Sequence, residues 1–270
     1  MKKCIIVGLP EAGKSTYIGA FWAIEKDGDT GHKLVCSKYP EDSVYLDSLK
    51  SSWKKQKEVN RSNQLEENEI IFELSSQSST EAITLCIPDF KGEKFQSIIQ
   101  NNIASEIDKW FKESDTVLFF LKYQERDTLQ DETSLPNPEN KQDQARVLTT
   151  NEMSEWTKNI MLLKYILNTY KIERFAICIS AWDKVDTDTY PTVESWLKAT
   201  SPFFLNFLKD NIKNFKLFGV SAQGIDYNNY PNGESVESIQ QKTEENRRAY
   251  VYESSINYDI TEPLYYLISK

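Results

Sequence analysis

The sequence predicts an α/β fold with a mostly parallel central sheet, one antiparallel hairpin strand, helices on both faces and polar insertions. Apolar runs of strand length alternate with stretches of helical periodicity along the 270 residues. The first run, residues 4–7, leads through a glycine-bounded loop directly into a helix-forming stretch. Polar residues follow several of the runs, at the sheet edge where open α/β folds bind their ligands.

Each expected element has a local signal. Buried strands are indicated by continuous apolar runs, and helices by apolar residues that recur every three or four positions. The turn-rich residues 75–80 join two strand-like runs, which predicts a hairpin. Pro263 is placed for the first turn of a closing helix that starts at Asp259 or Thr261. Strands are expected at 4–7, 69–74, 82–87, 116–121, 175–181 and 216–220, and helices at 17–24, 42–53, 95–112, 156–170, 193–199, 203–212 and 240–248.

Three long stretches interrupt this pattern, at about residues 25–68, 123–154 and 225–255. They contain few strand signals, and loops of this length inside a compact domain are unusual. No internal repeat and no clean boundary divides the chain. We therefore expect one domain over residues 1–270, with these stretches as insertions.

Composition excludes several function classes. The net charge is −9, which argues against a nucleic-acid partner, and no apolar run reaches membrane-spanning length. The four cysteines lack metal-ligand spacing, and Cys4, Cys86 and Cys178 lie in apolar runs, which predicts buried free thiols. His32 is the only histidine, so histidine-based catalysis is not expected. A cytoplasmic protein that does not contact a membrane fits these features best.

The glycine-bounded loop after the first strand is the strongest chemical signal. Residues 8–15 read Gly-Leu-Pro-Glu-Ala-Gly-Lys-Ser and match the phosphate-binding pattern G-x-x-x-x-G-K-[ST] between a strand and a helix. In this pattern backbone N–H groups point at a phosphate, so we expect Lys14 to reach the β- and γ-phosphates and the Ser15 hydroxyl to ligate magnesium. The alternative is a chance match to this pattern in an ordinary turn. The expected strand before the loop and the expected helix after it argue against that alternative. The expected phosphate contacts are Gly8, Glu11, Ala12, Gly13, Lys14, Ser15, Thr16 and Gly92.

Three further polar segments follow expected strands. Asp89-Phe90-Lys91-Gly92 follows the strand at 82–87, where an acidic residue could bind a metal and a glycine could approach a γ-phosphate. Asp183-Lys184-Val185-Asp186 follows the strand at 175–181, and Ser221-Ala222-Gln223 follows the strand at 216–220. Taken singly, each also fits a capped turn.

In this order and spacing, the four motifs resemble those of the Ras-like G domains, the TRAFAC-class GTPases. The resemblance covers essentially the whole chain and implies a P-loop G domain. The match to the [NT]-K-x-D base motif holds only at Lys184 and Asp186. The phrases Gly-Leu-Pro-x-x-Gly-Lys-Ser-Thr, Ile-Ser-Ala-Trp-Asp-Lys-Val and Asp-Ile-Thr-Glu-Pro-Leu look like those of the bacterial double-GTPase group, which is associated with conflict and phage-defence gene clusters.

The resemblance implies a guanine site. Asp186 would accept hydrogen bonds from guanine N1–H and the 2-amino group, Lys184 would cover the base, and the Ala222 N–H would bind O6. Adenine lacks the 2-amino group, and its N1 would face the carboxylate without a proton, which is a costly mismatch. The implied base-binding residues are Asp183, Lys184, Asp186, Ser221, Ala222 and Gln223.

Several residues depart from the family pattern. Asp183 replaces Asn or Thr and cannot donate to guanine N7 as an amide can, and Pro10 and Glu11 place a rigid residue and a negative charge in the phosphate loop. Glu93 stands where many relatives use Gln to orient water. In the family a threonine just before the second strand normally contacts magnesium and the γ-phosphate, and no such threonine is obvious in this sequence. The candidate metal ligands are Ser15, Ser62 (with Thr30 as the alternative) and Asp89, and the candidate catalytic residues are Lys14, Glu93 and Arg61.

The expected function is that of a GTPase, a hydrolase acting on the β–γ phosphoanhydride. The chain would bind GTP or GDP with Mg²⁺, turn over slowly and act as a switch toward a protein effector, in a setting such as anti-phage defence. An adenine-nucleotide P-loop ATPase or kinase is one alternative, although Phe90 after Asp89 leaves no acidic pair. A nucleotide-binding scaffold without turnover is the other, supported by Glu93 and the missing threonine.

Overall fold

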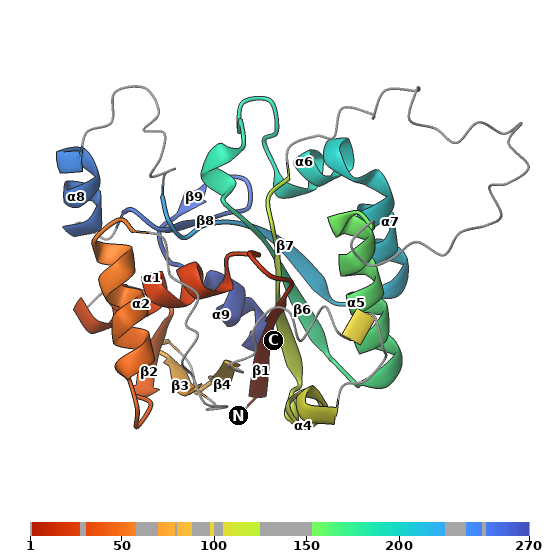
Figure 1. The fold of residues 1–270 in the computed structure, drawn as a ribbon, viewed down its shortest axis with the longest axis horizontal. Coiled ribbons are helices and arrows are strands. Elements are labelled where there is room, and N and C mark those ends of the chain that lie inside the picture. Colours follow the sequence, from red (N-terminus) through yellow and green to blue (C-terminus); the bar gives the residue numbers. More distant parts are fainter. Residues whose placement is uncertain are drawn as a thin grey trace, which may run out of the picture.

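A mixed β-sheet forms the centre of the computed structural model, which describes residues 2–27, 31–57, 70–78, 80–87, 98–99, 105–124, 153–224, 236–244 and 247–269 (Figure 1). Within these residues nine strands form one sheet in the order β2-β3-β4-β1-β5-β6-β7-β8-β9. The strands are β1 (Lys2–Gly8), β2 (Leu34–Lys38), β3 (Ile70–Ser76), β4 (Ala82–Ile87), β5 (Thr116–Leu121), β6 (Arg174–Ser180), β7 (Phe215–Ser221), β8 (Tyr250–Tyr252) and β9 (Ile256–Asn257). The helices are α1 (Lys14–Asp27), α2 (Val44–Lys54), α4 (Ser105–Glu113), α5 (Glu155–Thr169), η3 (Trp182–Lys184), α6 (Val193–Thr200), α7 (Pro202–Asn211), α8 (Val236–Glu244) and α9 (Glu262–Ile268).

The register brings the carboxyl ends of the central strands to one edge of the sheet. Strands β4, β1, β5, β6 and β7 run parallel, while β3 and β8 are antiparallel to their neighbours in this core. Gly8 at the end of β1 aligns with Phe120, Phe120 aligns with Cys178, and Cys178 aligns with Phe218. The loops that follow β1, β6 and β7 therefore leave the sheet at the same edge, where ligands bind in open α/β folds.

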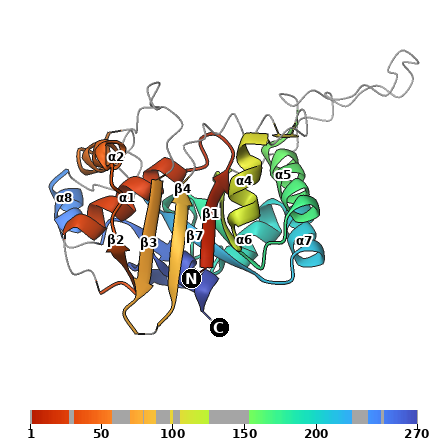
Figure 2. The same cartoon turned by 90° about the horizontal axis from the view of Figure 1, so that it is seen from below.

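Helices cover both faces of the sheet (Figures 1 and 2). One hydrophobic cluster joins α1, α2 and α9 to one face, and a second cluster joins α4, α5, α6 and α7 to the other. Strand β5 shows the alternation that this requires, because Leu118 and Phe120 belong to the first cluster, whereas Val117, Phe119 and Leu121 belong to the second. Continuous apolar runs in the sequence therefore correspond to strands buried on both faces.

The predicted fold class is confirmed, and the hairpin predicted at 69–87 is the antiparallel pair β3–β4. Strands β2, β8 and β9 were not predicted. They are two to five residues long and lie at the margins of the sheet, where an apolar strand signal is weak. The helix predicted at 240–248 is instead α8 (Val236–Glu244), and Arg248 lies in the turn before β8. Much of the predicted helix at 95–112 lies outside the described residues, which include its end in α4.

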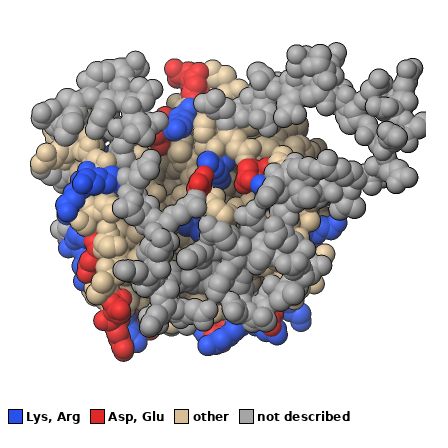
Figure 3. All heavy atoms as spheres, viewed as in Figure 1, with Lys and Arg blue, Asp and Glu red and all other residues tan. Residues whose placement is uncertain are grey.

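Cys4, Cys86 and Cys178 are buried free thiols, as predicted. His32 lies in a loop, as its neighbours indicated, but its side chain is buried, and Nδ1 lies 4.0 Å from Asp259 Oδ1. Acidic and basic side chains of the described residues are interspersed on the face seen in Figure 3. No helix among the described residues is long and apolar enough to cross a bilayer.

The Trp182 ring occupies space that only a glycine on β7 leaves open. A Cβ at Gly219 would lie 2.2 Å from Trp182 Cδ2, well inside van der Waals contact. The fully buried ring also stacks on Tyr252 and meets Trp196 edge-on, with ring centroids 5.6 Å and 5.7 Å apart. This packing fixes the start of η3, the segment that follows β6.

We expect Gly219→Ala to lower the free energy of unfolding by about 1–3 kcal/mol, the usual cost of overpacking a core. Urea denaturation measures this change. Trp182→Leu should relieve the clash, so that the double variant loses less stability than the sum of the two single variants. An unchanged urea midpoint in Gly219→Ala would contradict the packing described here.

Candidate functional site

The loop between β1 and α1 curls around the side chain of Lys14. The Lys14 ammonium donates hydrogen bonds to the Gly8 and Leu9 carbonyl oxygens, at 2.6 Å and 2.9 Å, and the Ala12 N–H donates to the Leu9 carbonyl at 3.3 Å. Lys14 is also the first residue of α1, and the first turn of that helix holds no acidic residue. The helix N-terminus and the ammonium group thus place positive charge beside the loop, as an anion site requires.

Two glycines allow this loop to lie close against the neighbouring strands. A Cβ at Gly8 would lie 2.7 Å from the Phe120 carbonyl oxygen on β5, and a Cβ at Gly13 would lie 2.7 Å from Ser180 Cβ at the end of β6. Gly13 also has φ +88°, a conformation that other residues adopt only with strain. Larger residues at these positions would push the backbone away from the sheet edge. The close fit of this loop against the sheet therefore depends on glycine at both positions, and the loop is a candidate phosphate cradle.

Glu11 carries the negative charge that the sequence placed in this loop, and Lys122 pairs with it. Glu11 Oε2 lies 2.8 Å from Lys122 Nζ, with both side chains about half exposed. Such a surface ion pair contributes little to stability, typically about 0–1 kcal/mol, but it offsets the carboxylate charge beside the candidate phosphate site. Sequence analysis missed Lys122, because 111 residues separate the two partners.

The segments after β6 and β7 meet through a short hydrogen bond. The Ser221 hydroxyl donates to Asp183 Oδ1 at 2.6 Å, and the Gly224 N–H donates to the Ser221 oxygen at 3.2 Å. Asp183 lies in η3, which follows the left-handed residue Ala181 (φ +51°). The two segments that the sequence motifs assigned to base recognition are therefore neighbours in space.

Asp186 is exposed, and its carboxylate accepts hydrogen bonds from the turn that follows it. The Thr189 hydroxyl donates at 2.6 Å, and the backbone N–H groups of Asp188 and Thr189 donate at 3.1 Å and 3.4 Å. The pKa of Asp186 is lowered, chiefly by the Thr189 hydroxyl and then by the two backbone donors. The capped turn considered from sequence is thus present, and it stabilises the ionised form of Asp186. A carboxylate has about four lone-pair sites, so it can accept further donors.

Tyr250 on β8 is a further residue of this cluster that sequence analysis missed. Burial raises the pKa of Tyr250 and the negative charge of Asp183 raises it further, while a hydrogen bond with Ser221 opposes these effects. Tyr250 reaches this position because β8 pairs with β7 at Ser221. The only sequence signal was the short apolar run Tyr-Val-Tyr inside a polar stretch.

The structure describes only some of the remaining predicted site residues. Ser15 and Thr16 lie in the first turn of α1, and the Lys184 side chain is exposed. The candidates Thr30, Arg61, Ser62, Asp89, Gly92 and Glu93 lie outside the described residues. Among the residues that the structure describes, no group of three or more His, Cys, Asp or Glu side chains could hold a metal ion.

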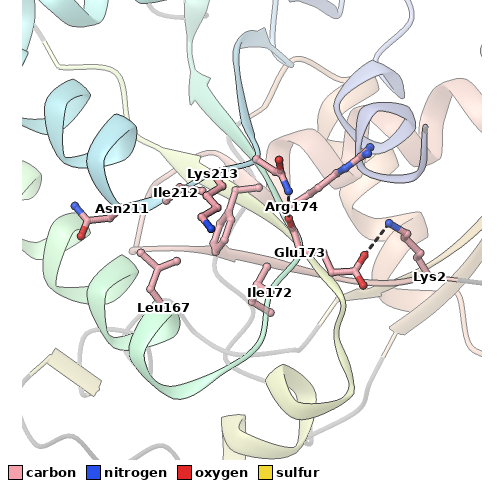
Figure 4. Close-up of a pocket in the computed structure, with 10 residues that line it drawn as sticks. Lys2, Leu167, Ile172, Glu173, Arg174, Asn211, Ile212 and Lys213 are labelled. Atoms are coloured by element: carbon pink, nitrogen blue, oxygen red, sulfur yellow. Dashed lines mark hydrogen bonds and ion pairs between the residues drawn. The ribbon is translucent and has the colours of Figure 1, made fainter.

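A cavity of about 530 Å³ lies at the opposite edge of the sheet, at the amino ends of β6 and β7 (Figure 4). Three of its charged residues, Lys2, Glu173 and Arg174, are engaged in local interactions. Lys2 pairs with Glu173 at 2.9 Å, and Arg174 donates to the backbone carbonyls of Tyr266 and Ser269 near the end of α9. This cavity has no glycine-bounded loop and lies away from the motif segments.

Comparisons with known proteins agree with the motif order. The family model described as Double-GTPase 1 matches residues 5–267. No protein with a curated description matches this sequence.

Two solved structures are similar at low identity. The bacterial selenocysteine-specific elongation factor EF-Sec matches at 12% identity and a TM-score of 0.40, over 82% of this chain and 26% of that chain. The S. cerevisiae Ski7 GTPase-like domain, bound to GDP and inorganic phosphate, matches at 13% identity and a TM-score of 0.41, over 91% of this chain and 50% of that chain. This chain therefore spans between a quarter and a half of their lengths.

The hydrogen bonds to Asp186 give a testable titration. We expect Thr189→Val to raise the pKa of the Asp186 carboxyl toward its ordinary value of 3.8, because the largest stabilising bond to the ionised form is removed. Carboxyl-carbon NMR resolves this titration.

Thr200→Val is the matched control, since the Thr200 hydroxyl donates to the Trp196 carbonyl oxygen within α6. The hydrogen bonds to Asp186 described above come from Asp188 and Thr189 instead. A depressed pKa favours folding above the ordinary pKa, and that contribution disappears as pH falls through the folded-state value. An Asp186 pKa unaffected by Thr189→Val would rule out this hydrogen bond as its main cause.

Proposed function

Because the chain belongs to the Double-GTPase 1 family, we propose that it binds GTP with Mg²⁺, hydrolyses the β–γ phosphoanhydride slowly and acts as a nucleotide-controlled switch toward a protein partner. One observation carries this proposal. The Lys14 ammonium is held by the carbonyls of a loop that only glycines at 8 and 13 allow, at the same sheet edge as the Asp183–Ser221 pair.

Phosphate binding would use groups of this loop and of the first turn of α1. The Lys14 ammonium would exchange the Gly8 and Leu9 carbonyls for β- and γ-phosphate oxygens, which are stronger acceptors because they are charged. Loop N–H groups and the N-terminus of α1 would add further donors. The Glu11–Lys122 ion pair would limit repulsion between Glu11 and the phosphates.

Hydrolysis would depend on positioning and charge neutralisation more than on an acid–base pair. Ser15, Asp89 and Ser62 are the proposed holders of Mg²⁺, which would neutralise charge on the β- and γ-oxygens. Gly92 would donate to the γ-phosphate, and Glu93 and Arg61 are the proposed groups for orienting water and stabilising transition-state charge.

Base recognition would divide between the segments after β6 and β7. Asp186, whose ionised form the Thr189 hydroxyl stabilises, would accept hydrogen bonds from guanine N1–H and the 2-amino group. Lys184 would cover the base, and Ala222 and Gln223 would border O6. A carboxylate cannot donate a hydrogen bond to guanine N7, so Asp183 would not bind the base in that way. It would instead hold the Ser221 hydroxyl in place by accepting its hydrogen bond.

We further propose that residues 1–270 form one G domain and that the partner is a protein, in a setting such as bacterial anti-phage defence. Free thiols at Cys4, Cys86 and Cys178 support a reducing, cytoplasmic compartment.

Nucleotide binding and phosphate release, measured with GTP and ATP side by side, test the function. We expect tight Mg²⁺-dependent GTP binding with slow phosphate release. A preference for ATP would favour the ATPase alternative, and GTP binding without any phosphate release would favour a scaffold.

Lys14→Ala should abolish detectable GTP binding in calorimetry while the chain stays folded, because it removes the ammonium group that would bind the β- and γ-phosphate oxygens. Lys209→Ala is the matched control, since Lys209 pairs with Glu194 on the surface of α7 and α6. Equal GTP affinity of Lys14→Ala and the unaltered chain would remove the phosphate site from this loop.

Asp186→Asn should weaken GTP binding and strengthen XTP binding. The new amide donor would face the guanine 2-amino group but suit the xanthine 2-carbonyl, and such polar matching can discriminate by a factor on the order of 10⁴. Competition of GTP, XTP and ATP for a fluorescent guanine nucleotide measures the change.

Asp188→Asn is the control for this exchange, because Asp188 is exposed and contacts Asp186 only through its backbone N–H among the hydrogen bonds described above. Should Asp186→Asn show no gain toward XTP, Asp186 does not contact the base.

A further inference from the structure

Two buried side chains hold the carbonyl groups of the loop at residues 221–224, which we call the base loop. The Trp53 indole N–H donates to the Ala222 carbonyl oxygen at 2.7 Å, and the Arg248 Nε–H donates to the Gln223 carbonyl oxygen at 2.9 Å. Trp53 belongs to α2, and Arg248 lies in the turn before β8. Segments from two distant parts of the chain thus converge on one loop of four residues.

Arg248 and Trp53 also bind each other. The Arg248 guanidinium carbon lies 4.2 Å from the centroid of the Trp53 ring, and one of its terminal nitrogens donates to the Trp53 carbonyl oxygen at 2.9 Å. Arg248 is only 2% exposed. A buried cation is costly unless hydrogen bonds and an aromatic face replace its water, and this arrangement supplies both.

Gly224 brings the base loop into direct contact with Arg248. Gly224 has φ +85°, and a Cβ there would lie 2.6 Å from the Arg248 carbonyl oxygen and 2.8 Å from Arg248 Cγ. At the other end of the loop, the Ser221 hydroxyl binds Asp183. The Ala222 N–H therefore lies in the chain between two groups that are held by hydrogen bonds. The Ser221 side chain before it is bound to Asp183, and the Ala222 carbonyl after it is bound to Trp53.

Helix α2 extends this support to the phosphate side of the site. A Cβ at Gly19 on α1 would lie 3.1 Å from the Leu49 carbonyl oxygen, so the two helix backbones approach closely. The Trp22 indole of α1 donates to Asp47 of α2 at 2.8 Å. The helix that begins at the phosphate loop is thereby joined through α2 to the base loop.

We propose that Trp53 and Arg248 are positioning residues for base recognition, which fix the Ala222 N–H at the place where it meets the oxygen at position 6 of the purine. This inference rests on the proposed function. Both side chains bind the loop through its carbonyl groups, so they act on the ligand through the loop and do not touch it. Helix α2 sets the position of the base loop relative to the phosphate loop.

The test compares three nucleotides on the full chain and on Trp53→Phe, which keeps an aromatic ring for Arg248 but loses the N–H donor. 6-Thio-GTP carries a weaker acceptor at position 6, and ITP lacks the 2-amino group that Asp186 would bind. We expect GTP affinity to fall about tenfold, which corresponds to about 1.4 kcal/mol, because the Ala222 N–H would no longer be held against the oxygen at position 6. The preference for GTP over 6-thio-GTP should shrink, while the preference for GTP over ITP stays unchanged.

Trp156→Phe is the matched control. Trp156 is a buried tryptophan on α5, in the hydrophobic cluster on the other face of the sheet, and all three affinities should stay as in the unaltered chain. Arg248→Lys is the second variant. It keeps the positive charge but loses the guanidinium group, which donates to both the Gln223 and the Trp53 carbonyl oxygens. It should shrink the same GTP to 6-thio-GTP preference if Trp53→Phe fails to fold.

The outcomes separate this inference from the proposed function. If the unaltered chain prefers GTP over both 6-thio-GTP and ITP, but the folded variants bind all three nucleotides more weakly by the same factor, Trp53 and Arg248 only stabilise the fold and the inference is wrong. If the unaltered chain shows no preference for guanine, the proposed function fails and the inference fails with it.

Discussion

The close approach of the loop between β1 and α1 to β5 and β6 is the constraint on which the rest of the candidate site depends. Gly8 and Gly13 stand where any Cβ would meet Phe120 or Ser180 at 2.7 Å. Because the loop lies against these strands, the Lys14 ammonium reaches the carbonyls of Gly8 and Leu9. The same contact sets the start of α1 beside the end of β6, from which the Asp183 segment continues.

A second layer of contacts joins the two ends of the candidate site, the loop between β1 and α1 and the loop at residues 221–224. Helix α2 packs closely on α1 at Gly19 and binds the base loop through Trp53. Arg248 completes this link with hydrogen bonds to Gln223 and Trp53. The loop at residues 221–224 is therefore held by residues that no short motif contains. Its geometry depends on α2, a helix that lies in the sequence between α1 and β3.

Much of the sheet and the loop between β1 and α1 could be predicted from sequence, because both are encoded by local patterns. Apolar runs specify β1, β5 and β6 directly, and the glycine spacing specifies the loop. The contacts between distant segments could not be predicted, because Lys122, Trp53, Arg248 and Tyr250 carry no motif and reach the site only after folding. Short marginal strands such as β8 were missed for a similar reason, since they are stabilised by pairing more than by their own residues.

The most direct test of the central claim is a structure of the chain with Mg²⁺ and a non-hydrolysable GTP analogue. We expect the β-phosphate within the loop of residues 8–15, with the Lys14 ammonium moved from the Gly8 and Leu9 carbonyls to phosphate oxygens. The guanine should lie between Asp186 and the base loop, with O6 facing the Ala222 N–H. A nucleotide bound in the cavity beside Arg174, or a Lys14 ammonium still bound to the two carbonyls, would contradict the claim.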